Sequence, residues 1–270
     1  MTAAGANARF YTALGLLGGT YVALIVGMMV ADLTYTSPGR ILDALRSPEI
    51  RYAIKLSLVS CLAAAILSLW VAVPLGYILA RTRFWGRPIL ETILDIPIVL
   101  PPLVIGLSLL ILFQTAPGKW IEGLFARAFG TPITFGIPAV ILAQFAVSAA
   151  FAVRTMRVTF DQTSPRTERV ALTLGCSRGQ AFWLVALPEA WRGVVSAGTL
   201  AWARALGEFG PILIFAGATR MRTEVLSTTI FLEWSVGRLE AGFAVSALMI
   251  VVAVIVLMVM RVFGVRGGIV

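Results

Sequence analysis

The sequence predicts an all-α polytopic membrane protein, on three observations. Hydrophobic residues make up 59% of the 270 residues, only 13% are charged, and the mean hydropathy is +0.92. The apolar residues gather in runs of about twenty, the length that crosses about 30 Å of hydrocarbon as a helix. The runs are continuously apolar and lack the alternation of a transmembrane β-strand. Six transmembrane helices in one domain, 1–270, are therefore expected.

The six expected spans follow one another along the chain with short connections, except before the fifth. The first does not resemble a cleaved signal peptide, because glycines interrupt it and no clear A-x-A site closes it. The expected spans are 10–31, 53–79, 89–113, 137–153, 193–216 and 241–262.

Lysine and arginine indicate the orientation of these spans. If both termini are cytoplasmic, the inner loops hold more Lys and Arg than the outer loops, as the positive-inside rule requires. The net charge of +9 is then mostly a topology signal. Because the arginines are scattered among span ends, no nucleic-acid partner is expected.

The residue inventory also limits the chemistry that this chain performs. It has no histidine, and its two cysteines, Cys61 and Cys176, lie far apart in the sequence. No metal site, bound cofactor or catalytic residue is therefore expected, and the chain is not expected to be an enzyme. No G-x-x-x-x-G-K-[ST] loop is present to bind phosphates, so any motor that uses ATP must be a separate subunit.

The connection 161–188 on the predicted inner side is unusually long and clearly punctuated. Ser164 is placed to cap a helix with Pro165 at its first position, and Gly175 is placed to end that helix. Ser177 and Gln180 form a capping-box pattern that starts a second helix. Leu187 and Pro188 are expected to close it. The sequence pattern alone is equally consistent with an amphipathic loop that packs against the helices of the same chain.

The same loop resembles the EAA loop of binding-protein-dependent ABC importer permeases. The order Glu168, Ala171, Gly175, Leu187 and Pro188 carries the likeness. The resemblance implies the type I importer fold and makes the first helix a coupling helix, which docks on an ATPase subunit that uses ATP and Mg²⁺. Arg169 and Val170 depart from the family, which often has Glu and Ala there.

The likeness extends from about residue 47 to 263. SPEIRYAIKLSL, VAVPLGYILARTRF and DIPIVLPPLVIGLSLL resemble the same permeases, and ARALGEFGPILIFAG is similar to the fifth-span motif of the molybdate, tungstate and sulfate branch. This resemblance implies a homodimer in the lipid of a prokaryotic inner membrane, together with two ATPase subunits and an extracytoplasmic substrate-binding protein. Molybdate or tungstate is the first expectation, with sulfate, thiosulfate or another small solute as the alternative.

The binding protein is expected at the outer loops 40–51, 119–127 and 220–238. Pro101 and Pro102 interrupt the third span, and such breaks are tolerated where protein or water satisfies the freed backbone groups. We expect a pore wall there, with a simple kink as the alternative. Four hydroxyl groups are candidates for donating hydrogen bonds to an anion: Ser108, Thr199, Thr228 and Thr229. Such hydroxyls more often bond backbone or neighbouring helices.

Charged residues inside the spans need partners, because each costs about 2.5–3.5 kcal/mol on insertion scales. Glu91 and Asp95 are expected to pair with Arg81, Arg83 or Arg87 near the inner end, with a proton relay as the alternative. Arg204 and Glu208 lie four residues apart on one helical face and can bond each other.

Two interpretations of that pair remain open: a salt bridge that holds the bundle together, or a gate at the subunit contact. In the second interpretation the small or helix-bending residues around the pair let the backbones approach and the helix bend. The gate candidates are Arg204, Gly207, Glu208, Phe209, Gly210 and Pro211.

Two other classes of membrane protein fit the sequence less well. An ion-coupled secondary carrier is expected to show internal repeats with paired broken helices, and no convincing repeat is visible between the halves. A membrane-embedded enzyme needs an acid–base set or a metal, most of which the missing histidines remove.

Overall fold

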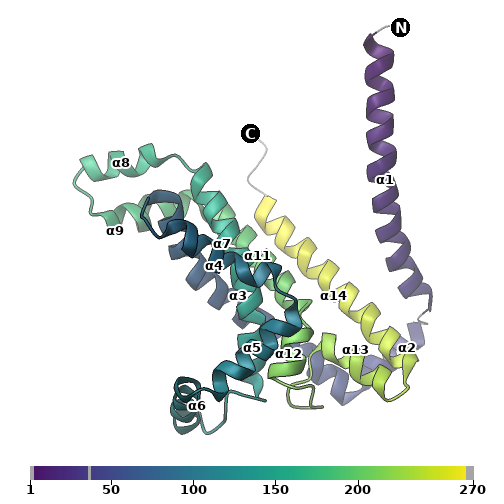
Figure 1. Ribbon diagram of the computed structural model, residues 1–270. Coiled ribbons are helices and arrows are strands. Elements are labelled where there is room, and N and C mark those ends of the chain that lie inside the picture. Colours follow the sequence, from purple (N-terminus) through teal and green to yellow (C-terminus); the bar gives the residue numbers. More distant parts are fainter. Residues whose placement is uncertain (1–2, 36–37, 266–270) are drawn as a thin grey trace.

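The computed structural model describes residues 3–35 and 38–265, and these residues are helical except for short connections (Figure 1). The two chain ends, whose cytoplasmic placement the sequence predicts, lie outside the described residues. In chain order the helices are α1 Ala3–Tyr35, α2 Pro38–Arg46, α3 Pro48–Arg81, α4 Arg87–Val99, α5 Pro102–Gln114, α6 Ala116–Phe129, α7 Ile137–Gln162, α8 Pro165–Thr173, α9 Arg178–Ala181, the π-helix η1 Phe182–Ala186, α10 Leu187–Glu189, α11 Trp191–Leu206, α12 Gly210–Phe215, α13 Leu226–Ser235 and α14 Leu239–Val265.

Four helices among the described residues are long and apolar enough to cross a membrane: α1, α3, α7 and α14. A fifth span is counted if α4 and α5, which meet at an angle of 114°, are taken together. The break predicted at Pro101 and Pro102 is confirmed there.

The fifth expected span, 193–216, is interrupted in the structure. Helix α11 ends at Leu206, and the short α12 begins at Gly210. Sixteen residues reach about 24 Å, which is less than the hydrocarbon thickness. Gly207 lowers helix propensity at this point, and Pro211 lacks the N–H that would continue the ladder. The fifth run is therefore a broken element.

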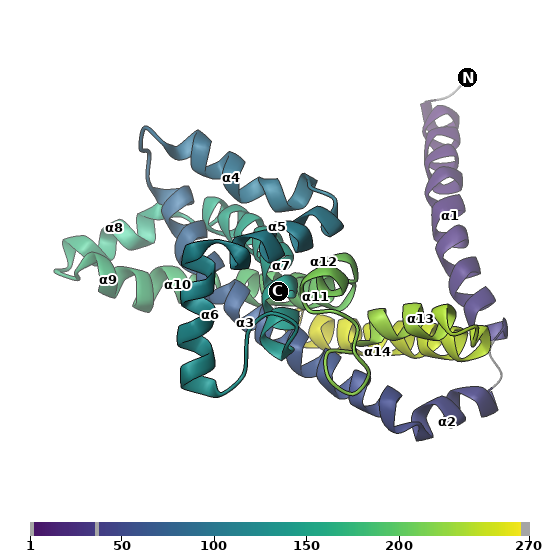
Figure 2. The same ribbon diagram turned by 60° about the horizontal axis from the view of Figure 1, so that its bottom comes forward.

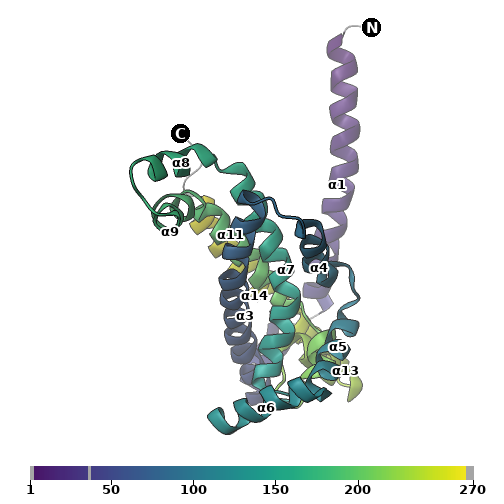
Figure 3. The same ribbon diagram turned by 60° about the vertical axis from the view of Figure 1, so that its left-hand side comes forward.

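The core of the bundle is the packing of α3, α7 and α11 (Figures 1 and 3). Small residues allow close approach: a Cβ built on Gly76 of α3 would lie 2.7 Å from Met156 Cβ and 2.9 Å from Arg157 N of α7. Farther from the α8 end of the same interface, the buried hydroxyls of Ser68 and Ser148 are 2.9 Å apart. Small residues and interhelical hydroxyl bonds are the usual means of helix association in lipid.

Helix α1 stands apart from this bundle in all three views (Figures 1, 2 and 3). Its apolar side chains are exposed, including Leu17 and Tyr21. Near its end Asp32 comes within reach of Ser246 on α14, at 3.4 Å between Oδ2 and Oγ. A helix with this apolar surface is suited to contact with lipid.

The α3–α7 contact makes a prediction about stability. Gly76→Ala should destabilise the protein by about 1–3 kcal/mol, because the new methyl group overlaps backbone atoms that cannot move alone. The measurement is the thermal unfolding midpoint in detergent. Gly123→Ala on α6 is the matched control, since nothing lies within 4 Å of its Cβ position. Equal midpoints for both variants would contradict the close approach.

Candidate functional site

The loop after α7 folds as the capping residues predict. The Ser164 hydroxyl accepts a hydrogen bond from the Arg166 N–H at 3.3 Å, which starts α8. At its other end Gly175 has φ +92°, and the Cys176 N–H donates to the Ala171 carbonyl at 3.1 Å. This Schellman arrangement requires a backbone conformation that favours glycine. The predicted glycine corner is confirmed.

The second helix of the loop also begins as predicted, with a Ser177–Gln180 capping box. The expectation that Leu187 and Pro188 end it is wrong, because helical backbone continues to Glu189. A π-helix, Phe182–Ala186, precedes the proline, and the Leu187 N–H donates to the Phe182 carbonyl five residues back. The wider turn gives room for a residue that cannot donate to the ladder and whose ring crowds the preceding turn.

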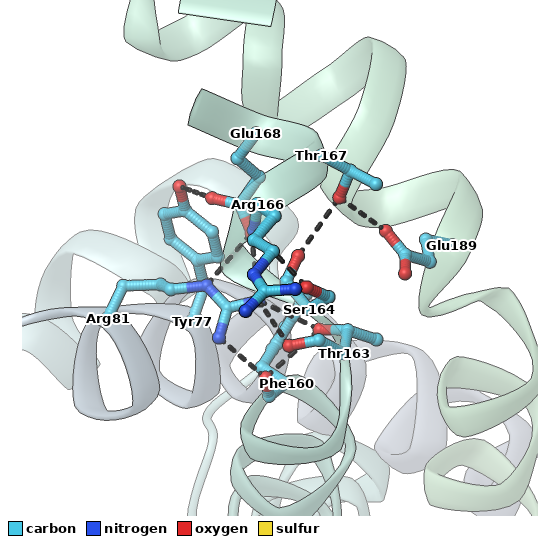
Figure 4. Close-up of polar contacts among 9 residues, drawn as sticks. All are labelled: Tyr77, Arg81, Phe160, Thr163, Ser164, Arg166, Thr167, Glu168 and Glu189. Atoms are coloured by element: carbon cyan, nitrogen blue, oxygen red, sulfur yellow. Dashed lines mark hydrogen bonds and ion pairs between the residues drawn. The ribbon is translucent and has the colours of Figure 1, made fainter. Parts of the chain in front are cut away.

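A buried ion pair fastens α8 to the inner end of α3 (Figure 4). Both Nε and Nη2 of Arg81 lie 2.8 Å from Glu168 Oε1, and the Tyr77 hydroxyl donates to Oε2 at 2.9 Å. Arg81 also donates to the Phe160 carbonyl at 2.7 Å and to Thr163 Oγ1 at 2.8 Å. Glu168 is only 7% exposed. One guanidinium therefore joins α3, the end of α7 and α8.

A second contact closes the base of the loop. The Thr167 hydroxyl donates to Glu189 Oε2 at 3.0 Å, which joins the start of α8 to the end of α10 (Figure 4). The sequence offered Arg81 only as a partner for Glu91 or Asp95, and it did not single out Tyr77. No local pattern links Arg81 to a glutamate 87 positions away.

The carboxylate of Glu91 is held by two other arginines. Its Oε1 lies 2.7 Å from Arg87 Nε and 3.2 Å from Arg157 Nη1, and Arg157 also reaches Asp161 at 3.8 Å. The predicted pairing of Glu91 with Arg87 is confirmed. Asp95 lines a small cavity, of about 100 Å³, beside Arg154 and Arg157.

The two broken elements lie against each other (Figures 1 and 2). A Cβ on Gly106 of α5 would lie 2.7 Å from Pro211 Cα, and one on Gly210 of α12 would lie 3.1 Å from Leu103 N. The structure thus brings the Pro101–Pro102 break and the Gly210–Pro211 motif together, although more than a hundred residues separate them. Protein backbone packs where both helices are interrupted, as a break in a membrane requires.

Arg204 and Glu208 form the predicted ion pair, with Arg204 Nη1 2.5 Å from Glu208 Oε1. Glu208 is 1% exposed, and the Arg204 guanidinium lies 5.5 Å from the centre of the Phe151 ring. The Glu208 carbonyl accepts from the Ser227 hydroxyl at 2.7 Å, which ties the break to α13. Phe209 stacks near Phe231, with ring centres 5.5 Å apart.

Three of the four hydroxyls offered as anion donors bond their own backbone. Thr199 donates to the Val195 carbonyl, and Thr228 and Thr229 donate to the Val225 carbonyl. Ser108 is exposed on α5. Among the described residues, no group of three His, Cys, Asp or Glu is placed to hold a metal ion.

A buried acid that no sequence pattern indicates lies in the connection between α12 and α13. Glu224 is fully buried, and neither of its carboxylate oxygens has a hydrogen-bond partner among the described residues. Burial raises the pKa of Glu224, and the nearby Thr229 hydroxyl and Arg220 guanidinium offset part of that rise. Arg220 is itself paired with Glu233 at 2.7 Å.

Comparisons with known proteins agree on one group. Residues 72–266 match the family model described as "Binding-protein-dependent transport system inner membrane component". The molybdenum transport system permease protein ModB of Mycobacterium bovis is 37% identical over 214 residues, 78% of this chain and 79% of that protein. The sulfate transport system permease protein CysT of Salmonella typhimurium is 30% identical over 234 residues, 87% and 83% of the two chains.

A solved structure shares the fold. It is a chain in the crystal structure of a bacterial alginate ABC transporter in complex with an alginate pentasaccharide-bound periplasmic protein. The TM-score is 0.71, with 17% sequence identity and 94% of each chain covered.

The Arg81 anchor makes a prediction about the loop. Arg81→Ala should lower the free energy of unfolding by about 3 kcal/mol, because it leaves the buried Glu168 carboxylate without its charged partner. Trypsin should also cleave faster at Arg166 and Arg169. The double variant Arg81→Met/Glu168→Leu should recover much of the loss, since no unpaired charge remains. Arg83→Ala, at an exposed position, is the control. A loss no greater than that of Arg83→Ala would contradict the anchor.

The buried Glu224 predicts a pH dependence. An acid whose pKa is higher in the folded than in the unfolded protein lowers the free energy of unfolding once it ionises. The loss begins as pH rises past the unfolded pKa, about 4.3, and is complete above the folded pKa. Glu224→Gln should therefore raise the thermal midpoint more at pH 8 than at pH 5. The exposed Asp43→Asn is the control. An equal change at both pH values would argue against a buried, titrating carboxyl group.

Proposed function

Because the chain belongs to the family of binding-protein-dependent transport system inner membrane components, we propose that it forms the translocation pathway for a small tetrahedral oxyanion, molybdate or tungstate. It is the multi-pass inner-membrane permease of an ABC importer and is not itself the ATPase. Two copies of this chain form the pathway, and two separate ATPase subunits supply the motion from ATP and Mg²⁺.

The observation that carries the coupling role is the anchor of α8. A loop that passes motion into a membrane must be joined firmly to the spans, and Arg81 joins Glu168 of α8 to α3 and to the end of α7. Since α3 and α7 are closely packed through Gly76, a displacement of α8 moves both spans as one body. Glu168, Ala171 and Gly175 are the coupling residues of this proposal.

The pathway is lined by the broken elements. Helices α5 and α12 meet at Gly106, Gly210 and Pro211, where backbone approaches backbone. An exposed carboxylate here would repel an oxyanion, but Arg204 neutralises Glu208 across 2.5 Å. The pair then acts as a gate: it stays closed to solvent while Arg204 bonds Glu208, and the short connection between α11 and α12 lets the helix bend.

Two lines of support favour the oxyanion. The residues 203–217 resemble the oxyanion branch, and two relatives are named for transport of molybdenum and of sulfate. The higher identity, 37% against 30%, favours molybdate, with tungstate as its chemical analogue. Sulfate is the second candidate. An extracytoplasmic binding protein delivers the anion to the outer loops 40–51, 119–127 and 220–238, and both chain termini face the cytoplasm.

The test is ATP hydrolysis by the reconstituted complex of permease, ATPase and binding protein. Binding protein loaded with molybdate or tungstate should stimulate hydrolysis, and sulfate-loaded protein should not. Gly175→Val should reduce that stimulation roughly tenfold, because a side chain at φ +92° stores about 1–3 kcal/mol of strain at the corner of the loop.

Gly179→Val is the matched control, since Gly179 lies in α9 with no atom within 4 Å of its Cβ position. If only sulfate-loaded binding protein stimulated ATP hydrolysis, sulfate would take the place of molybdate in the proposal, and the coupling role would stand. Normal stimulation in Gly175→Val would contradict the coupling role.

A further inference from the structure

The one acidic residue of α8 does not lie on its exposed face. Glu168 and Ala171 are buried toward the bundle, and both Glu168 oxygens are used by Arg81 and Tyr77 (Figure 4). In a helix the residues three and four positions apart share a face, so Arg166, Arg169 and Val170 form the opposite stripe. Both arginines are exposed, as is Arg178 at the start of α9.

Large apolar side chains accompany these arginines. Val170 is 57% exposed and Leu174 is 79% exposed. The neighbouring acids are engaged elsewhere, since Glu189 accepts from Thr167 and Asp161 faces Arg157. We call Arg166, Arg169, Val170, Leu174 and Arg178 the basic face. Arginine beside exposed aliphatic groups is the composition of a protein-binding surface.

The position of the basic face favours a protein over lipid headgroups as its partner. The span predicted from the sequence ends at Val153, and α7 continues from the exposed Arg154 for eight more residues to Gln162, or about 12 Å along the helix axis. The headgroup layer is only about 5–8 Å thick on each side. With the span ending at Val153 and α7 near the membrane normal, α8 begins beyond that layer, and it lies at the far end of the bundle from α6 (Figure 1).

We propose that the basic face docks in an acidic groove of the ATPase subunit, with carboxylates opposite Arg166 and Arg169 and an apolar floor beneath Val170 and Leu174. This inference rests on the proposed importer function and adds the chemistry of the partner surface. The carboxylate of Glu168 takes no part in docking, because it holds α8 to α3. Specific recognition of one ATPase then depends on the charge of the groove.

The experiment measures binding of the purified ATPase subunit to the full permease in nanodiscs. Arg169→Glu should weaken binding at least roughly tenfold at low salt, because a like charge then faces the groove. Arg169→Gln should have a smaller effect. Rising salt should weaken wild-type binding and should weaken Arg169→Glu binding less, because salt also screens the new repulsion. Arg83→Glu makes the same charge change in the exposed α3–α4 connection and should bind as wild type.

Each outcome separates the alternatives. An ATPase that binds the wild type and is insensitive to Arg166→Glu and Arg169→Glu overturns the acidic groove while the importer function stands. A wild-type permease that binds no ATPase overturns the function itself. If the effect of Arg169→Glu requires anionic lipid and disappears in phosphatidylcholine nanodiscs, the partner is the membrane and the proposal is wrong. Restoration of Arg169→Glu binding by an acid-to-lysine change in the groove supports it.

Discussion

The close packing of α3 against α7 is the contact on which the rest of the structure depends. Gly76 lets the two backbones meet, and both helices run on past the apolar region toward the loop. Arg81 stands at the last turn of α3, so it can reach the end of α7 and Glu168 at the same time. Without that approach the guanidinium would have no common position from which to bond three segments, and α8 would be free to move alone.

The need to satisfy backbone hydrogen-bonding groups inside a membrane explains how the interrupted helices pack. A break within a membrane leaves donors and acceptors without ladder partners, and those groups must meet protein or water. Here the breaks after α4 and after α11 belong to elements that pack together through Gly106 and Gly210. Glu208 sits at the second break with its own arginine. A paired charge and an interrupted helix thus occur together at one place, which is the arrangement that the proposed gate requires.

Helix α8 divides its two faces between different tasks. The face with Glu168 is fixed to the bundle, and the face with Arg169 is open. The proposed coupling role needs both, because a rigid attachment transmits motion and an exposed surface receives it. Arg169 takes no part in the attachment, since the neighbouring Glu168 makes it. In the proposed docking, the arginine sets the charge of the exposed face and so the partner surface that fits it.

The sequence by itself determined the class of protein, the caps of α8 and α9, the Gly175 corner, the break at Pro101–Pro102 and the pairing of Arg204 with Glu208. These depend on composition or on residues within a few positions of each other, so local physics is sufficient. It indicated a bend near Gly207–Pro211 but not a full break of the fifth run, and it misjudged the helix end at Pro188, which a π-helix precedes. Only the tertiary structure decided that Arg81 bonds Glu168, that α5 meets α12, and that Glu224 is buried, because each joins or covers segments whose separation along the chain carries no periodic signal.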